Sequence, residues 1–244
     1  LTAEAAYTFS DDIDINASIN SNSKAPDFNF QLFQSDYLSY NWQNNFRNQQ
    51  TKQLAFRLKS KKFGTLQIDY NTLDNYLYFA KDINDAVKPN QFDETVNYIR
   101  AKLSNEVSYR NFALNNTILY QNVMAGDAVY NVPEIVTRHS LYYTNEFFKK
   151  ALFLQTGVTF SYFSSYYMNR YDPLLAEFYV QNDREFGDYP RLDFFLNAKI
   201  RQTRIYLKAE HFNSSFTGYN YYSAPTYPYR DFAIRFGVVW NFFL

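Results

Sequence analysis

Two adjacent residue pairs combine side chains that enzymes use as nucleophiles and proton carriers. His139 precedes Ser140, and Glu210 precedes His211. Both pairs lie where apolar and polar residues alternate, which predicts β-strands. Neighbouring residues of a strand point to opposite faces, so neither pair can form the hydrogen bond that activates a nucleophile. We therefore expect no catalytic residues, and the alternation places both histidines on the apolar face.

The acidic residues Asp11, Asp12 and Asp14 offer oxygen ligands of the kind that calcium binds. Calcium needs a cage of about six or more oxygens. These three flank a predicted tight turn, where aspartate is common for other reasons. The chain has no cysteine, so thiolate metal sites and disulfides are excluded. Because no spaced histidine set or glycine-rich phosphate loop occurs either, we expect no metal and no cofactor.

The charges are balanced, and the aromatic content is high. There are 24 Lys and Arg residues against 24 Asp and Glu residues, so the chain lacks the basic excess that nucleic acids select. Aromatic residues make up 21% of the 244 residues, although the mean hydropathy is only −0.47. A soluble core can rarely hide so many rings, whereas a barrel in lipid exposes them. No segment reaches the roughly 18 apolar residues of a transmembrane helix.

Strict alternation of apolar and polar residues is the dominant pattern of the chain. It is clearest at the end, where Phe232, Ile234, Phe236, Val238 and Trp240 share one face. Such a period of two predicts strands with two different faces. It predicts about thirteen strands, at 1–10, 12–20, 27–34, 37–44, 50–60, 63–79, 92–108, 112–123, 134–147, 150–168, 190–200, 203–213 and 229–243.

The connections between these strands alternate between short and long. The short ones lie near Asp11, Ser35–Asp36, Lys61–Lys62, Arg110–Asn111, Lys149–Lys150 and Arg201–Gln202. The long ones cover 81–91, 124–133, 169–189 and 214–228, with more modest ones at 21–26 and 45–49. Short periplasmic turns and longer extracellular loops are typical of outer-membrane barrels. The sequence therefore predicts an all-β fold, a single antiparallel transmembrane β-barrel domain over 1–244 in the outer membrane.

With the apolar face in lipid, the opposite face lines the lumen. Its charged candidates carry both signs, interleaved: Arg100, Lys102, Glu106, Arg138, Arg191, Asp193, Lys199, Arg204, Lys208, Glu210, Asp231 and Arg235. The turn at Arg201–Gln202 sets Asp193 opposite Glu210. Lys208 is then diagonal to Asp193 and Arg191 is diagonal to Glu210, so these cations should neutralise the two carboxylates. Two states of the lumen stay open: a wet channel of mild ion selectivity, or a lattice of salt bridges that nearly fills it.

The long connection 169–189 carries an apolar cluster, which is unusual for an exposed loop. Its members are Leu174, Leu175, Phe178 and Tyr179. We expect these side chains to be buried, either as a constriction in the barrel mouth or against a partner protein.

The direction of each strand follows from the last one. The chain ends in a strand on Phe242–Leu244, which the outer-membrane assembly machinery recognises in such barrels. If 229–243 runs down to the periplasm, counting backwards makes 1–10 run down as well. Bacterial barrels have even strand numbers, so we expect a longer barrel of about 14 strands, with these residues as its C-terminal part. If 27–44 were one strand, 1–10 would instead pair with 229–243. The chain begins at Leu1 without a signal peptide, which fits a mature chain or a piece of one.

Several stretches resemble the outer-membrane family known as putative porins, characteristic of Bacteroidota. They include VPEIVTRHSLYY from Val132, ALFLQTGVTFSY from Ala151, and YYSAPTYPYRDFAIRFGVVWNFF at the end. Tyr171–Pro173 with Phe178–Gln181, and Gly187, Tyr189 and Pro190 before DFFLNAKI, add to the resemblance. It covers most of residues 50–244 and implies a barrel of the outer membrane. Members are usually much longer than this chain.

Two functions from different classes remain open. One is porin-like passive passage of small polar solutes. The other is a structural or accessory barrel subunit within a larger outer-membrane complex, with the apolar loop cluster as its contact. The expected partners are outer-membrane lipid, the assembly machinery through the C-terminal strand, and other outer-membrane proteins, but no nucleic acid.

Overall fold

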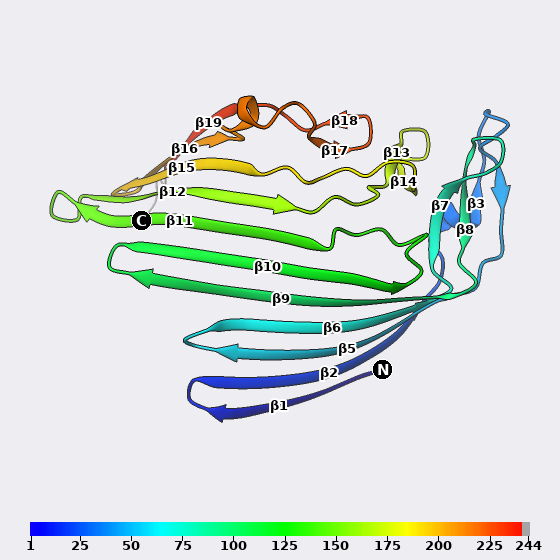
Figure 1. Cartoon of the computed structure of the whole chain (residues 1–244), viewed down its shortest axis with the longest axis horizontal. Helices are drawn as coiled ribbons and strands as arrows, with labels where there is room; N and C mark the ends of the chain where they lie inside the picture. The colour runs from blue at the N-terminus through cyan, green and yellow to red at the C-terminus, as the bar shows by residue number, and fades with distance from the viewer. Residues whose placement is uncertain (241–244) are drawn as a thin grey trace.

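The computed structural model describes residues 1–240, which form a large antiparallel sheet of eleven strands. Each strand of this sheet pairs with the sheet strands that come before and after it in the sequence (Figure 1). The strands are β1 (Thr2–Ser10), β2 (Ile13–Lys24), β5 (Gln49–Ser60), β6 (Gly64–Asp74), β9 (Thr95–Tyr109), β10 (Phe112–Ala125), β11 (Ile135–Phe147), β12 (Leu152–Phe163), β15 (Arg191–Ile200), β16 (Thr203–Glu210) and β19 (Ala233–Trp240). Within residues 1–240, no helix has the length and apolar character needed to cross a bilayer.

The strands have the length that a tilted passage through a bilayer requires. They run from 8 residues in β16 and β19 to 15 residues in β9. A transmembrane β-strand needs about 9–11 residues. Pairing on both sides satisfies the backbone N–H and C=O groups of every strand between β1 and β19, which lipid itself cannot do.

All short turns lie at one end of the sheet and all long connections at the other, as predicted (Figure 1). The turns 11–12, 61–63, 110–111, 148–151 and 201–202 join consecutive strands. Arg110 and Arg201 adopt the left-handed conformation, with φ of 54° and 53°. Such positive φ values match the right-handed twist of a two-residue hairpin. The long connections are 25–48, 75–94, 126–134, 164–190 and 211–232.

Residues 27–44 are not two strands of the large sheet, so this prediction was wrong. They belong to the long connection 25–48, with α1 (Phe28–Gln31) and a small pair of strands, β3 (Leu32–Phe33) and β4 (Trp42–Gln43). No hairpin turn of the large sheet therefore lies at Ser35–Asp36. Phe30 stacks on Phe79 at 4.5 Å between ring centroids, so these aromatics are buried among loops rather than in the sheet. The large sheet has eleven strands instead of about thirteen.

The long connections build a second, smaller sheet at their end of the molecule. Its order is β13 (Arg170–Asp172), β14 (Glu177–Val180), β7 (Leu77–Lys81) and β8 (Val87–Gln91). β14 runs parallel to β7 and sets Tyr179 beside Phe79. We call β3, β4, β7, β8, β13 and β14 the loop cap. The connection 211–232 adds η1 (Ser214–Phe216) and the pair β17 (Tyr222–Ala224) and β18 (Tyr227–Pro228).

The edge strands β1 and β19 run in the same direction, as the count of strand directions predicted. Ten antiparallel pairings separate them, and both point toward the short turns (Figure 1). Within the described residues β1 and β19 do not pair with each other, so the outer edge of each has bare backbone groups. The predicted signal at Phe242–Leu244 lies outside the described residues.

The register separates the sheet into an apolar and a polar face, because directly paired residues point the same way. One row of paired residues crosses seven strands and is apolar throughout: Val107, Leu114, Leu141, Val158, Phe194, Ala209 and Ile234. The adjacent row is polar: Glu106, Asn115, Ser140, Thr159 and Asp193. Phe236, in an apolar position of β19, is 78% exposed. This two-faced sheet confirms the alternation seen in the sequence.

Candidate functional site

The structure gathers the predicted charged candidates on the polar face of the sheet. By the register they share this face with the row that contains Asp193. β9 carries Arg100, Lys102 and Glu106, β11 carries Arg138, β15 carries Arg191, Asp193 and Lys199, β16 carries Arg204, Lys208 and Glu210, and β19 carries Arg235. The twelfth candidate, Asp231, precedes β19 in the connection 211–232, where its carboxylate accepts a hydrogen bond from the hydroxyl of Tyr221.

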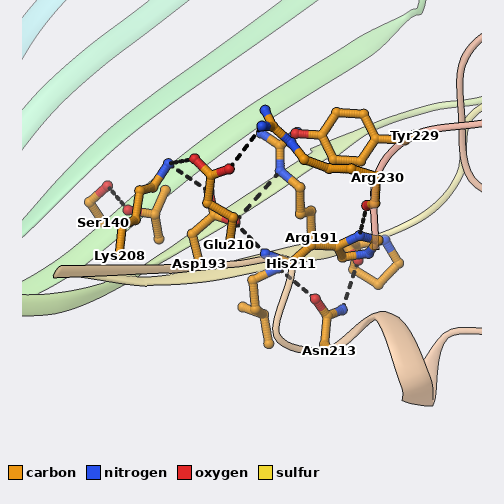
Figure 2. A network of polar contacts seen from close by, with 12 residues as sticks. Ser140, Arg191, Asp193, Lys208, Glu210, His211, Asn213, Tyr229 and Arg230 are labelled. Carbon is orange, nitrogen blue, oxygen red and sulfur yellow. Dashed lines mark hydrogen bonds and ion pairs between the residues drawn. The ribbon is translucent and has the colours of Figure 1, made fainter. Parts of the chain in front are cut away.

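Cations contact both Asp193 and Glu210, and the predicted diagonal contact of Lys208 with Asp193 is confirmed (Figure 2). Arg191, which was predicted to lie diagonal to Glu210, instead forms an ion pair with Asp193. Lys208 Nζ lies 3.5 Å from Asp193 Oδ2 and 2.9 Å from Glu210 Oε1. Arg191 Nε lies 4.0 Å from Asp193 Oδ1. Both carboxylate side chains are about one tenth exposed, at 9% and 10%. A charge so far from water needs such partners, because desolvation otherwise disfavours it.

Two further arginines reach Glu210 that the sequence reasoning did not assign to it. Arg230 Nη1 and Arg235 Nε each lie 3.1 Å from Glu210 Oε2. Arg235 is directly opposite Lys208, and therefore diagonal to Glu210, so the strand register contained this contact. Arg230 lies in the connection before β19, where no alternating pattern predicts the face toward which a side chain points. Both arginines stabilise the carboxylate and tie the start of β19 to the end of β16.

His211 is buried and does not lie on the apolar face, so its predicted position was wrong. Strand β16 ends at Glu210, and His211 has a φ of 53°, which breaks the alternation. Its backbone N–H donates to Asp193 Oδ1 at 2.8 Å, and its Nδ1 lies 2.9 Å from the carbonyl oxygen of Arg230. The ring packs edge-on against Tyr221 at 4.5 Å. His211 thus anchors the connection 211–232 over the charge cluster (Figure 2).

Neither His139 with Ser140 nor Glu210 with His211 is arranged for catalysis. His139 Nδ1 lies 2.7 Å from Asn116 Oδ1 on one face, whereas Ser140 Oγ lies 2.9 Å from Thr159 Oγ1 on the other. In the acidic stretch, Asp14 accepts a hydrogen bond from Thr8. Asp12 lies 3.7 Å from Lys61 Nζ. Within residues 1–240 no cluster of acidic or histidine side chains has the arrangement of a metal site.

A hollow of about 350 Å³ lies on the polar face across β6, β9, β10 and β11. Its lining residues are Gln67, Asp69, Arg100, Lys102, Thr117, Leu119, Val136, Thr137 and Arg138. Asp69 is buried, and Arg100 Nη2 lies 3.0 Å from its Oδ2. Gln67 Nε2 donates to both carboxylate oxygens of Asp69 at 3.1 Å. The single carboxylate of the hollow is therefore fully occupied by its own neighbours.

The apolar cluster of 169–189 is only half buried within this chain. Tyr179 is 8% exposed in a cluster with Phe79 and Val87, and Leu175 packs against it. Leu174 and Phe178 are 49% and 55% exposed, so the described chain itself does not bury these two, and their burial against a partner stays a prediction. The cluster therefore serves partly to build the loop cap, and leaves two apolar side chains outside it.

A hydrogen bond joins two distant connections inside the loop cap. The hydroxyl of Tyr40 donates to Asp172 Oδ2 at 2.8 Å, and Asp172 Oδ1 accepts from the backbone of Leu174 and Leu175. Burial, and then this contact with the carboxylate, raise the pKa of the Tyr40 phenol to about 12. The phenol therefore remains a hydrogen-bond donor up to strongly alkaline pH.

Comparison with protein families gives one match over the full chain. A family model described as "putative porin" matches residues 1–244. No curated protein matches the sequence.

Solved structures of outer-membrane receptors share the fold. The siderophore receptor PirA from Acinetobacter baumannii superimposes with a TM-score of 0.63 at 10% identity, over 97% of this chain and 40% of the receptor. FpvA of P. aeruginosa, with a heterologous pyoverdine and iron, gives 0.59 at 12% identity, over 98% and 32%. BauA, the ferric preacinetobactin receptor from A. baumannii, gives 0.54 at 15% identity, over 87% and 31%. The chain thus spans two fifths or less of each receptor, and the likeness concerns the fold alone.

Proposed function

Because this chain belongs to the putative porin family, whose members are β-barrel proteins of the outer membrane, we propose that it forms part of the wall of a water-filled barrel. Small polar solutes would cross this barrel passively. The observation that carries the proposal is the division of the sheet into one apolar and one polar face. The apolar row from Val107 to Ile234 suits contact with acyl chains, and the row from Glu106 to Asp193 suits contact with water.

The distribution of ion pairs on the polar face favours a wet lumen over one filled by salt bridges. Ion pairs of this face gather around Asp193 and Glu210 and at Asp69, and one more joins Glu146 to Lys150 at a short turn. Between these places Lys102 and Arg138 are exposed, with no hydrogen bond or ion pair among residues 1–240. A lattice that fills the lumen would engage such long cationic side chains.

We also propose that further strands outside these residues close the barrel. An unpaired strand edge in lipid costs several kcal/mol for each bare N–H or C=O group. Because β1 and β19 run in the same direction, a ring of antiparallel pairs needs an odd number of additional strands between them. The function proposed here belongs to that complete barrel.

Single-channel recording of the full-length protein in planar bilayers tests the proposal. We expect stepwise conductance that scales with bulk salt conductivity, as a water-filled pore requires. In proteoliposomes, the swelling rate should fall as the size of an uncharged sugar rises. Liposomes that received the same detergent without protein are the control. A protein that inserts and folds, yet gives neither conductance nor swelling, would contradict passive passage.

A second function, an accessory subunit of an outer-membrane complex, is favoured by one observation. Leu174 and Phe178 remain exposed on the long-connection side although both are apolar, and such a patch suits contact with a partner. The double variant Leu174→Ser, Phe178→Ser should then lose a protein that co-purifies in mild detergent, while Ile83→Ser should keep it. Ile83 is a matched control because it is equally apolar and fully exposed on another connection. Retention of the partner by the double variant would exclude this contact.

A further inference from the structure

Two cationic side chains in the hollow of the polar face have no partner in the described part of the chain. Lys102 extends from β9 and Arg138 from β11, and both are exposed where they line the space of about 350 Å³. Neither forms a hydrogen bond or an ion pair with another residue of 1–240. A volume of this size matches the lower range of small-ligand pockets, about 300–1,000 Å³.

The hollow has an uncompensated positive charge. Arg100, Lys102 and Arg138 line it, against the single carboxylate of Asp69. Arg100 and Gln67 already satisfy that carboxylate. Because like charges in one hollow repel each other, an anion bound between Lys102 and Arg138 lowers the electrostatic energy of the site.

The strand between the two cations contributes one hydrogen-bond donor that suits an oxyanion, the hydroxyl of Thr117. The register places Thr117 of β10 directly opposite Arg138 on one side and Ser104 of β9 on the other. Thr117 lines the hollow beside Leu119, on the strand that separates Arg138 from Lys102, whereas Ser104 follows Lys102 on the same face of β9 outside the lining. A guanidinium binds two oxygens of a phosphate or carboxylate at once, and an ammonium adds a point charge. A cation would need a free anionic ligand, and the only carboxylate that lines the hollow is occupied.

The polar face as a whole carries a net positive charge, as the hollow does. On the paired strands it bears eleven cationic side chains against seven carboxylates, although the whole chain is balanced. The cations are Lys24, Arg57, Lys59, Arg100, Lys102, Arg138, Arg191, Lys199, Arg204, Lys208 and Arg235, and the carboxylates are Glu4, Asp14, Asp69, Glu106, Glu146, Asp193 and Glu210. A passage lined with a surplus of one sign concentrates ions of the other.

We propose that Lys102 and Arg138 form a binding subsite for small oxyanions such as phosphate, and that the barrel passes anions in preference to cations. The preference for anions rests on the proposed passive passage, because ions must cross the barrel before it can select among them. It adds the class of solute and the residues that select it.

Reversal potentials and phosphate block measure the two parts of the proposal in the full-length protein. In a KCl gradient the reversal potential should lie closer to the equilibrium potential of chloride than to that of potassium. Inorganic phosphate should reduce the chloride current at millimolar concentration. In the double variant Lys102→Gln, Arg138→Gln, the concentration for half block should rise by about tenfold or more, since a charge-assisted contact contributes about that much. Both side chains are exposed and unpaired, so their loss leaves no buried group unsatisfied.

The matched control is the double variant Lys59→Gln, Lys199→Gln. It removes the same charge from the same face, from exposed residues nearer the short turns. We expect it to lower anion preference slightly and to leave phosphate block unchanged. Arg138→Lys should keep the anion preference and weaken the block, because it loses the two-oxygen contact. Equal weakening of block in both double variants, or unchanged block in the hollow variant, overturns the subsite.

Direct binding separates a failure of the subsite from a failure of passive passage. Phosphate titrated into the detergent-solubilised full-length protein should release or absorb heat in a calorimeter, and the Lys102→Gln, Arg138→Gln variant should lose this signal. Binding without any conductance would overturn the proposed passage and keep the subsite. Conductance without phosphate binding would overturn the subsite and keep the passage.

Discussion

Replacing Leu196 with arginine is expected to lower the free energy of unfolding in lipid by about 2–4 kcal/mol, the cost of a cation at the middle of the lipid face. Leu196 lies near the middle of β15 on the apolar face, opposite Leu207. An arginine there has no water within reach except by bending toward the membrane surface. Urea titration of the full-length protein refolded into lipid vesicles, followed by tryptophan fluorescence, measures the loss.

The neighbouring residue supplies the control for this prediction. Asn197→Arg introduces the same side chain one position along the same strand, on the polar face opposite Gln155 and Tyr206. No other cation is directly opposite, so we expect a loss below about 1 kcal/mol. Equal losses at 196 and 197 would mean that the assignment of faces is incorrect.

The second large effect is expected at Glu210, whose carboxylate contacts Lys208, Arg230 and Arg235. Glu210→Gln leaves these cations around a neutral amide. Its side chain is 10% exposed, so water compensates poorly. Breaking a buried charge network costs about 3 kcal/mol or more. Unfolding in vesicles and the rate of proteolysis within 211–232 should both report it, because Arg230 belongs to that connection.

Glu106→Gln is the matched control for the charge network. Glu106 lies on the same polar face, but it is exposed and accepts a hydrogen bond from Asn115. An amide oxygen can accept the same bond, so we expect a change below about 0.5 kcal/mol in the free energy of unfolding.

Raising the salt concentration should affect the Glu210 network little, since partly buried pairs are screened less than exposed ones. A small effect of Glu210→Gln would show that the cluster is solvated in the complete barrel.

Alternation alone predicted the strands and their faces well, because both depend on local order in the chain. The turn at Arg201–Gln202 fixed the register between β15 and β16, and from it the contacts of Asp193 with Lys208 followed. The prediction failed at 27–44, where aromatic residues also alternate. Alternation shows that a segment has two faces, but it does not show which sheet receives it. Here Phe30 packs against Phe79, which is distant in sequence and lies outside the large sheet.

Two features of the candidate site depend on backbone geometry that residue types do not reveal. The positive φ of His211 ends β16 and turns the ring away from the apolar face. That same turn places Arg230 within reach of Glu210. The unpaired state of Lys102 and Arg138 was also hidden, since β10 has no acidic residue beside them and Asp69, diagonal to Lys102 on β6, is engaged by Arg100. A register for β9, β10 and β11 would have revealed it.

The parallel pairing of β14 with β7 bears on the order in which parts of the protein fold. Tyr179 meets Phe79 only when two segments roughly a hundred residues apart in the chain arrive at the same place. Hairpins such as β9–β10 join neighbouring segments and close quickly, whereas contacts between distant segments pay a larger entropy of loop closure. We therefore expect the hairpins of the large sheet to form before the contact between Tyr179 and Phe79.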